Sequence, residues 1–355
     1  MAVLSMSVVV DSYEYTLIKI ASLKSLIIPH GEFLKLGRIS DLKKLIGELD
    51  KYYPGLSLKF QDKEVSIIDL EIELYKIFYK IYEKILTASP RQLQDFLRSL
   101  LYRYEVWNLK TLLAGTLANM DRDAIRKEIV MKPEELLQRS KFIENLLKQD
   151  NITHILRILR KSMYAGIIKR GYYYFTQRKE IFLLEALLDK FFVENLYKTQ
   201  HDYTGKEKGI FKNAIDVIIQ KYNLMLIYRS FRNNVPKELL KQLTIPAGSI
   251  FTADMIAQFV SYEKTSDFIT HLRSFIQSHK ELKKIDILKT GTDSDLITHL
   301  LSVLNKVIFK KLTELDIADI DSITIKRVLS FIFNKENEIY RVLGLLVKTT
   351  YNLKE

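Results

Sequence analysis

Apolar side chains recur every three or four positions along most of this chain, which is the period of an α-helix with one buried face. Between residues 67 and 86, six apolar positions form one stripe: Ile67, Leu70, Leu74, Ile77, Ile81 and Ile85. Ser89 and Pro90 then interrupt the pattern, with Ser89 placed to cap and Pro90 to begin a second helix over 91–117. The pattern therefore predicts a helical hairpin.

The same periodicity returns in six later segments, which are 134–148, 181–198, 210–231, 252–280, 293–314 and 322–347. The linkers expected between helices are 118–132, 199–209, 233–250 and 281–294. Two short pieces, Leu56–Phe60 and Tyr172–Phe175, are candidate strands, and neither has a clear partner. The predicted fold class is all-α.

Composition favours the same fold class. The 355 residues include only 12 Gly and 6 Pro, too few for the many tight turns of a β-sandwich or barrel. We expect more than about 60 % helix and almost no sheet. The length suggests two or three compact units.

Internal repetition is the most informative feature of the chain. Three segments begin with an acid or amide, have a polar residue three positions later and continue as an apolar helical run. The first residues are Glu105, Gln220 and Glu338, and the polar residues are Asn108, Asn223 and Arg341, at intervals of 115 and 118 residues. An earlier block, 33–49, resembles 142–159 and, more weakly, 259–275. We therefore expect three helical repeats, 1–118, 119–232 and 233–355; the alternative is that amphipathic helices resemble one another by chance.

Charge leaves several partners open. The chain has 55 basic and 43 acidic residues, a net charge of +12, which suits nucleic acid, an anionic membrane surface or an acidic protein. Basic and acidic residues are interleaved, as is typical of a solvated helical surface.

Cysteine is absent, which excludes disulfides and thiolate sites. Neither a signal peptide nor a membrane-spanning helix is expected, since the start lacks a basic segment and no apolar run approaches about 20 residues.

No residues with catalytic spacing were found. His271 and His279 are eight residues apart, without a third ligand at zinc-like spacing. Residues 344–349 resemble the end of a P-loop but lie inside an expected helix, where backbone N–H groups are already used. The aromatic cluster Tyr172–Phe175 could stack on bases, but aromatic residues at helical spacing are more typical of a helical core. We expect Trp107 to pack between helices. We expect no catalytic, cofactor or metal site.

The longer motifs resemble a known family, formed by the d-subunit of V-type ATPases and the C-subunit of archaeal A-type ATP synthases. The stretch that runs from 70–75 to 104–111 resembles the first repeat of this family. Residues 184–189, with Asn223 and Arg229, resemble the second repeat, and 335–339 resembles the closing helix of the family. The resemblance spans roughly residues 13 to 350. The departures are Ala114 and Val347 in place of arginines, Arg341 in place of an asparagine, and Lys19 and Lys24 where arginines are common.

This resemblance implies a funnel of three similar helical bundles around a pseudo-threefold axis. It also implies a non-catalytic rotor subunit, peripheral on the cytoplasmic face of the membrane. The implied partners are the central-stalk subunits D and F and the membrane proteolipid ring, with the membrane stator subunit as a further candidate. No cofactor and no nucleic acid are expected. The alternative function is a basic α-helical repeat protein that binds nucleic acid.

Candidate interface residues lie on the three matching helices: Asn108, Lys110, Asn223, Arg229, Arg232, Arg341 and Lys348. We expect four of the basic members to face the socket that receives the stalk, namely Arg229, Arg232, Arg341 and Lys348. The alternative is that they are solvated cations near the C-terminal ends of helices, where the helix dipole favours positive charge.

Overall fold

The computed structural model describes residues 13–61, 65–178, 181–205, 207–283, 292–314 and 320–351. Helices account for 77 % of the described residues, which contain no strand. The all-α prediction is therefore confirmed. The two strand candidates were wrong: Leu56–Lys59 is helix α4, and Tyr172–Phe175 lies within helix α11, Ala165–Arg178. Neither segment has a neighbouring strand to bond its backbone, whereas a helix satisfies its own N–H and C=O groups.

The chain divides into two compact units. Unit 1 comprises residues 1–148 and 318–355, and unit 2 comprises 149–317. The division into three repeats at residues 118 and 232 concerns internal similarity rather than compactness, and it stays a prediction.

Unit 1 is built from ten helices and one 3-10 turn in its described part. They are α1 (Tyr13–Leu23), the turn η1 (Lys24–Leu26), α2 (His30–Leu36), α3 (Leu42–Leu49), α4 (Leu56–Lys59), α5 (Ile67–Thr87), α6 (Arg91–Leu117), α7 (Arg122–Glu128), α8 (Lys132–Leu136), α9 (Ser140–Leu147) and α18 (Ile320–Thr350).

Unit 2 is contiguous in sequence. Its described helices are α10 (Ile152–Leu159), α11 (Ala165–Arg178), α12 (Phe182–Thr199), α13 (Glu207–Arg232), α14 (Lys237–Leu243), α15 (Ala253–Ser261), α16 (Thr265–Ser278) and α17 (Asp293–Glu314).

The predicted hairpin of α5 and α6 is present, and the two helices pack together. Every member of the α5 stripe from Leu70 onwards is buried. Ser89 does not cap α6, because its hydroxyl donates to the carbonyl of Ile85, 2.7 Å away, and Pro90 occupies the N-cap position. The break between the helices was predicted correctly, but the predicted capping role of Ser89 was wrong.

Several predicted helices and linkers were wrong in detail. Segment 134–148 is divided between α8 and α9, with Gln138 in a left-handed conformation (φ 59°), and 252–280 is divided between α15 and α16. The linkers 118–132 and 233–250 contain α7 and α14. Asp121 explains the first of these, since its carboxylate accepts hydrogen bonds from the backbone N–H groups of Asp123 and Ala124 and caps α7. Most of 281–294 lies outside the described residues.

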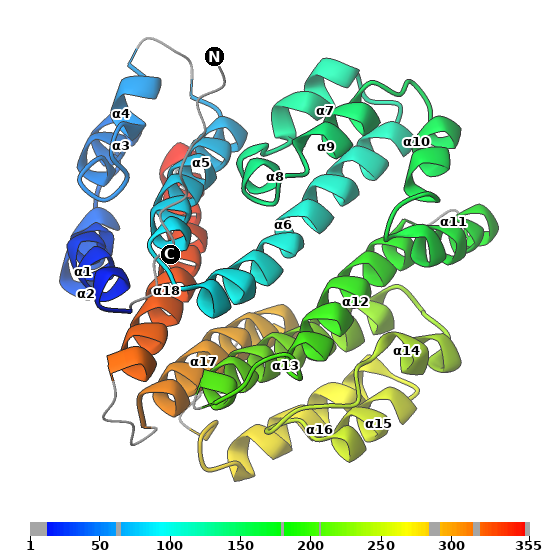
Figure 1. Ribbon diagram of the computed structural model, residues 1–355. Coiled ribbons are helices and arrows are strands. Elements are labelled where there is room, and N and C mark those ends of the chain that lie inside the picture. Colours follow the sequence, from blue (N-terminus) through cyan, green and yellow to red (C-terminus); the bar gives the residue numbers. More distant parts are fainter. Residues whose placement is uncertain are drawn as a thin grey trace. The chain divides into compact units, whose positions relative to one another are not determined.

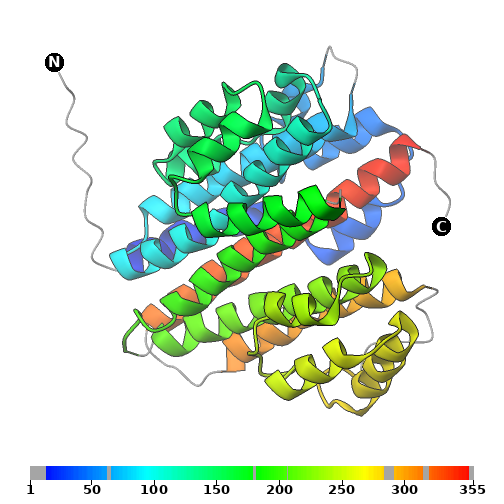
Figure 2. The same ribbon diagram turned by 90° about the vertical axis from the view of Figure 1, so that its right-hand side faces the viewer.

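Within unit 1, the last helix packs against the first part of the chain. Helix α18 contacts α1, α3 and α5. In Figure 1 it lies beside the blue N-terminal helices, and the turned view in Figure 2 keeps it there. Segments about 300 residues apart in sequence therefore share one core.

Within unit 2, α13 packs against α12 and α17, and α11 packs along α12. Gly171 allows the approach of α11 and α12: a Cβ atom at this position would lie 2.4 Å from a methyl carbon of Leu184. Such a distance is shorter than any real contact, so the close packing requires glycine.

Candidate functional site

The acid or amide that begins each of the three matching segments is buried. Glu105, Gln220 and Glu338 are 0 %, 1 % and 5 % exposed. Each accepts hydrogen bonds from the short-helix region packed on its own long helix. Gln220 accepts from the N–H groups of Ile250 and Phe251, at 3.0 Å each, just before α15 begins. The three side chains therefore hold their long helices to the short-helix regions packed against them.

Asn108 and Asn223 make the same pair of bonds within their respective units. Asn108 donates to the carbonyl of Val130 (2.9 Å) and accepts from its N–H group (3.1 Å). Asn223 donates to the carbonyl of Ile245 (2.7 Å) and accepts from its N–H group (2.9 Å). In both cases the partner is 22 residues later. Both side chains are buried and bonded internally, so their observed role is to hold the chain that follows each long helix.

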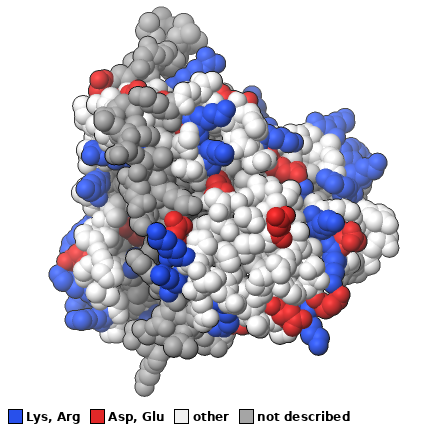
Figure 3. Space-filling model, turned by 90° about the horizontal axis from the view of Figure 1, so that it is seen from below, with Lys and Arg blue, Asp and Glu red and all other residues white. Residues whose placement is uncertain are grey.

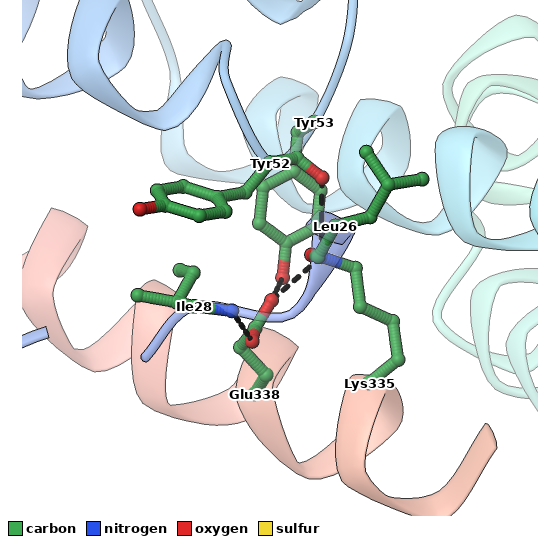
Figure 4. A network of polar contacts seen from close by, with 6 residues as sticks. All are labelled: Leu26, Ile28, Tyr52, Tyr53, Lys335 and Glu338. Carbon is green, nitrogen blue, oxygen red and sulfur yellow. Dashed lines mark hydrogen bonds and ion pairs between the residues drawn. The ribbon is translucent and has the colours of Figure 1, made fainter. Parts of the chain in front are cut away.

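A third network joins α18 to the N-terminal region of unit 1 (Figure 4). Lys335 Nζ donates to the carbonyls of Leu26 (2.6 Å) and Tyr52 (3.1 Å) and to Glu338 Oε1 (2.6 Å). Glu338 also accepts from the N–H group of Ile28 (2.7 Å) and from the hydroxyl of Tyr53 (2.9 Å). Both buried charges are thus surrounded by hydrogen-bond partners, which is the condition for tolerating such a pair inside a protein.

Burial shifts the pKa values of two side chains in this network. Burial lowers the pKa of Lys335, although Glu338 opposes that effect. Burial, and then the nearby carboxylate of Glu338, raises the pKa of Tyr53 well above its ordinary value. Lys335 Nζ lies 3.7 Å from the centroid of the Tyr53 ring, a further stabilising contact for the cation.

A separate polar cluster joins α6 to α18 inside unit 1. Arg103 forms an ion pair with Glu336, and the hydroxyl of Tyr104 donates to the same carboxylate oxygen at 2.7 Å. Arg103 also donates to the Tyr104 hydroxyl at 2.8 Å. Burial raises the pKa of Tyr104 far above its ordinary value, so its hydroxyl remains protonated.

Two further buried carboxyl groups lie beside Asn108. Glu105 pairs with Arg139, and Glu134 Oε1 accepts from Asn108 Nδ2 at 2.7 Å. Burial, followed by the negative charge of Glu105, raises the pKa of Glu134 to about 9. Glu134 is therefore protonated at neutral pH, which removes the repulsion between the two groups.

The predicted interface cations occupy varied environments. Arg229 donates to Glu185 (3.2 Å) and lies over the Phe182 ring, with its side chain 42 % exposed. Arg232 is exposed at the last residue of α13, and Arg341 is exposed over the ring of Phe33.

Lys110 and Lys348 are half-buried. Of the seven interface candidates, the structure thus places Arg232 and Arg341 most openly at the surface. Whether any of the seven contacts a partner remains a prediction.

Sequence reasoning missed the structural role of Lys335 and the Arg103–Glu336 pair. A signal was present for Lys335, because it continues the helical stripe of Val328, Ile332, Ile339 and Val342, all of which are buried. A lysine on an apolar stripe indicates a buried, partnered charge. No comparable signal identifies Glu336, whose partner Arg103 lies 233 residues earlier.

The described residues contain no group of three or more His, Asp or Glu side chains that could hold a metal ion. The His271 ring instead contacts the Tyr262 hydroxyl at 2.6 Å, and His279 follows the end of α16. Residues 344–349 lie within α18, so their backbone is not free to form a phosphate loop. Among the described helices, none is both long enough and apolar enough to cross a membrane.

Surface charge gives no support for a dedicated nucleic-acid groove on the face drawn in Figure 3. There, Lys and Arg lie in separate groups with Asp and Glu among them. An electrostatic footprint for nucleic acid would gather basic residues along one stripe.

Comparison with known proteins is decisive for the family. The sequence profile of the ATP synthase (C/AC39) subunit family matches residues 19–355. The chain belongs to this family. The resemblance seen in the repeated motifs is thereby confirmed.

Relatives within the ATP synthase (C/AC39) subunit family cover most of the chain at low identity. The C-subunit of the A-type ATP synthase of Methanosarcina acetivorans is 22 % identical over 335 residues, covering 93 % of this chain and 86 % of the relative. The corresponding protein of Methanococcoides burtonii is 21 % identical over 356 residues, 97 % and 92 % of the two chains. That of Thermococcus kodakarensis is 21 % identical over 342 residues, 95 % and 86 %.

Proposed function

We propose that this chain is a non-catalytic rotor subunit of an A/V-type ATP synthase, seated peripherally on the cytoplasmic face of the membrane. It connects the central-stalk subunits D and F to the proteolipid ring and transmits torque between them. Membership of the ATP synthase (C/AC39) subunit family carries this proposal. The membrane stator subunit is a further candidate partner.

The hydrogen bonds inside each unit support a mechanical role for the chain. A torque-bearing body must keep its long helices fixed to their neighbours, and buried polar groups with satisfied hydrogen bonds fix one arrangement among several. The paired bonds of Asn108 and Asn223 and the Lys335–Glu338 network do this at three long helices.

The three matching segments also support three similar bundles around a pseudo-threefold axis. Each of the related sequence blocks, 33–49, 142–159 and 259–275, spans the end of one short helix and most of the next. A socket between three such bundles is our proposal for the place where the stalk is received.

The test is a complex reconstituted with and without this chain, in which ATP hydrolysis and ion pumping are measured on the same preparation. We expect the isolated catalytic head to hydrolyse ATP unchanged without the chain and the complex to lose pumping. Loss of hydrolysis by the isolated head would contradict a purely mechanical part. Pumping retained without the chain would contradict coupling.

Contacts with the stalk can be mapped with single cysteines, because the chain has none of its own. Arg232→Cys and Lys212→Cys place a cross-linker at two exposed positions towards opposite ends of α13. We expect cross-links to the stalk from residue 232 and none from residue 212. The reverse pattern would move the proposed socket away from the predicted cations.

A further inference from the structure

A cavity of ≈ 250 Å³ in unit 1 lies between α5, α6, the end of α7 and the segment that follows it. Pockets that hold drug-sized ligands usually have about 300–1,000 Å³, so this one has room for a single long side chain. Its chemistry comes from four aromatic residues, Tyr75, Tyr79, Tyr104 and Trp107, and two acidic residues, Glu71 and Glu128.

The aromatic walls are locked against each other by edge-to-face contacts. The ring centroids of Tyr75 and Trp107 are 5.3 Å apart at 81°, and those of Tyr79 and Tyr104 are 4.9 Å apart at 82°. The three tyrosines are buried, whereas Trp107 is 37 % exposed. Trp107 therefore gives the cavity an aromatic surface that a ligand can reach from solvent.

Two carboxylates, those of Glu71 and Glu128, give the cavity its charge. Neither Glu71 nor Glu128 forms a hydrogen bond or an ion pair with any residue that the structure describes. Burial raises the pKa of Glu71, because the charged form has lost part of its hydration. A cation that enters the cavity would replace that hydration and return the carboxylate to its ordinary pKa range.

We propose that this cavity binds the side chain of an arginine from a partner protein. A planar guanidinium stacks on Trp and Tyr rings and pairs with carboxylates through two parallel hydrogen bonds, and the cavity offers both groups together. The cavity presents these two carboxylates in a chain whose net charge is +12. The described arginine beside Tyr104, Arg103, is already paired with Glu336 and does not supply the ligand.

A protein partner, rather than a free small cation, is favoured by the surroundings of the cavity. Ile68 also lines it and is 56 % exposed, next to the partly exposed Trp107. An approaching protein surface would bury both apolar side chains while its arginine enters, and such an arrangement is typical of an interface hot spot. This inference stands apart from the coupling function, since it concerns one pocket of the isolated chain.

Trp107 is the only tryptophan of the chain, so its fluorescence reports directly on the cavity. The probe is N-acetyl-arginine amide, titrated into the full-length protein, with N-acetyl-citrulline amide as its neutral counterpart and N-acetyl-lysine amide as a second cation. We expect a saturable change with arginine that is at least about tenfold weaker with citrulline. Equal responses, or no saturation with arginine, would overturn the proposal, and lysine binding as tightly as arginine would overturn the assignment to arginine.

Variants separate the pocket from nonspecific charge effects. Glu71→Gln and Glu128→Gln should each weaken arginine binding about tenfold. The control is the double variant Glu144→Gln with Glu238→Gln, two exposed acids outside the cavity, which should bind as the unaltered protein does. An equal loss in the control would overturn the site.

One further variant tests whether the cation that enters the cavity comes from a partner protein or from this chain. Lys63 lies outside the described residues and only a few positions before Ile68 in sequence. If Lys63→Gln bound the arginine probe more tightly than the unaltered protein, the cavity would serve the chain's own lysine and the partner would be excluded. Unchanged affinity is the result expected for an arginine that comes from outside.

Discussion

Lys335 and Glu338 form an ion pair inside unit 1, with 2.6 Å between Nζ and Oε1 and side-chain exposures of 0 % and 5 %. The pair lies one turn apart on α18, but most of its hydrogen bonds reach the N-terminal region of the chain. It therefore joins two ends of the sequence that share one core.

Replacing Lys335 by methionine should destabilise the protein strongly. The variant keeps the apolar stem but leaves the Glu338 carboxylate buried without its cation, and removal of one partner from a buried pair typically costs about 3–5 kcal/mol. The measurement is urea unfolding followed by circular dichroism.

The control for this variant is Lys76→Met. Lys76 pairs with Glu73 at the same separation along its helix and the same 2.6 Å distance, but the two side chains are 47 % and 18 % exposed. The expected loss is at most about 1 kcal/mol. Similar losses in both variants would mean that burial of the α18 pair contributes little.

Replacing Asn223 by alanine should loosen the segment that follows α13. The change leaves the N–H group of the buried Ile245 without a partner, at about 1–3 kcal/mol, whereas its C=O group keeps the hydrogen bond from the N–H group of Ala247. Asn213, ten residues earlier on α13, makes no side-chain hydrogen bond in the described structure, and Asn213→Ala is the control. We expect a lower unfolding midpoint and faster amide exchange near Ile245 only in the Asn223 variant.

Glu134 should make stability depend on pH. In the folded protein its pKa is raised to about 9 by burial and by Glu105, against an ordinary value of 4.5. The folded state therefore holds a proton that the unfolded chain has already released, and this stabilisation, complete below about pH 4.5, is lost as pH rises towards 9. The loss is up to about 1.4 kcal/mol per pH unit.

Glu134→Gln imitates the protonated acid without a titrating group, so its stability should fall less steeply between about pH 5 and 9, the window set by the raised pKa. The control is Glu135→Gln on the next residue, whose side chain is 53 % exposed. The comparison is urea unfolding of the three proteins across this range. Parallel profiles for the unaltered protein and the Glu134 variant would contradict the raised pKa.

The sequence predicted the helices because the apolar stripe is a local property, repeated every three or four residues. It also aligned Asn108 with Asn223, and the structure gives both the same pair of bonds to a residue 22 positions later. It could not predict where α18 packs, because the partners of Lys335 and Glu338 lie about 300 residues earlier and leave no local pattern. Prediction from hydrophobic periodicity also assumes that every lysine and glutamate is exposed, so it did not identify the buried pair of Lys335 and Glu338.

The predicted interface cations need a direct test of stalk binding. Arg232 is exposed, and Arg229 is half-exposed and paired with Glu185. Reversing both to glutamate should weaken docking of the stalk if they face its socket. The effect should be larger at low salt, because charges separated by more than the Debye length, about 10 Å at 0.1 M, are screened.

Two companion variants make this experiment specific. Arg229→Gln with Arg232→Gln removes the charges without creating repulsion against Glu185, and it should weaken docking by a smaller factor. Lys208→Glu with Lys212→Glu makes the same change of charge at exposed positions near the start of α13, and it should leave docking unchanged. Binding of the purified stalk is measured at two salt concentrations, with circular dichroism to verify folding. An equal, salt-dependent loss in the lysine variant would mean that only total charge matters and that the two arginines are ordinary helix-end cations.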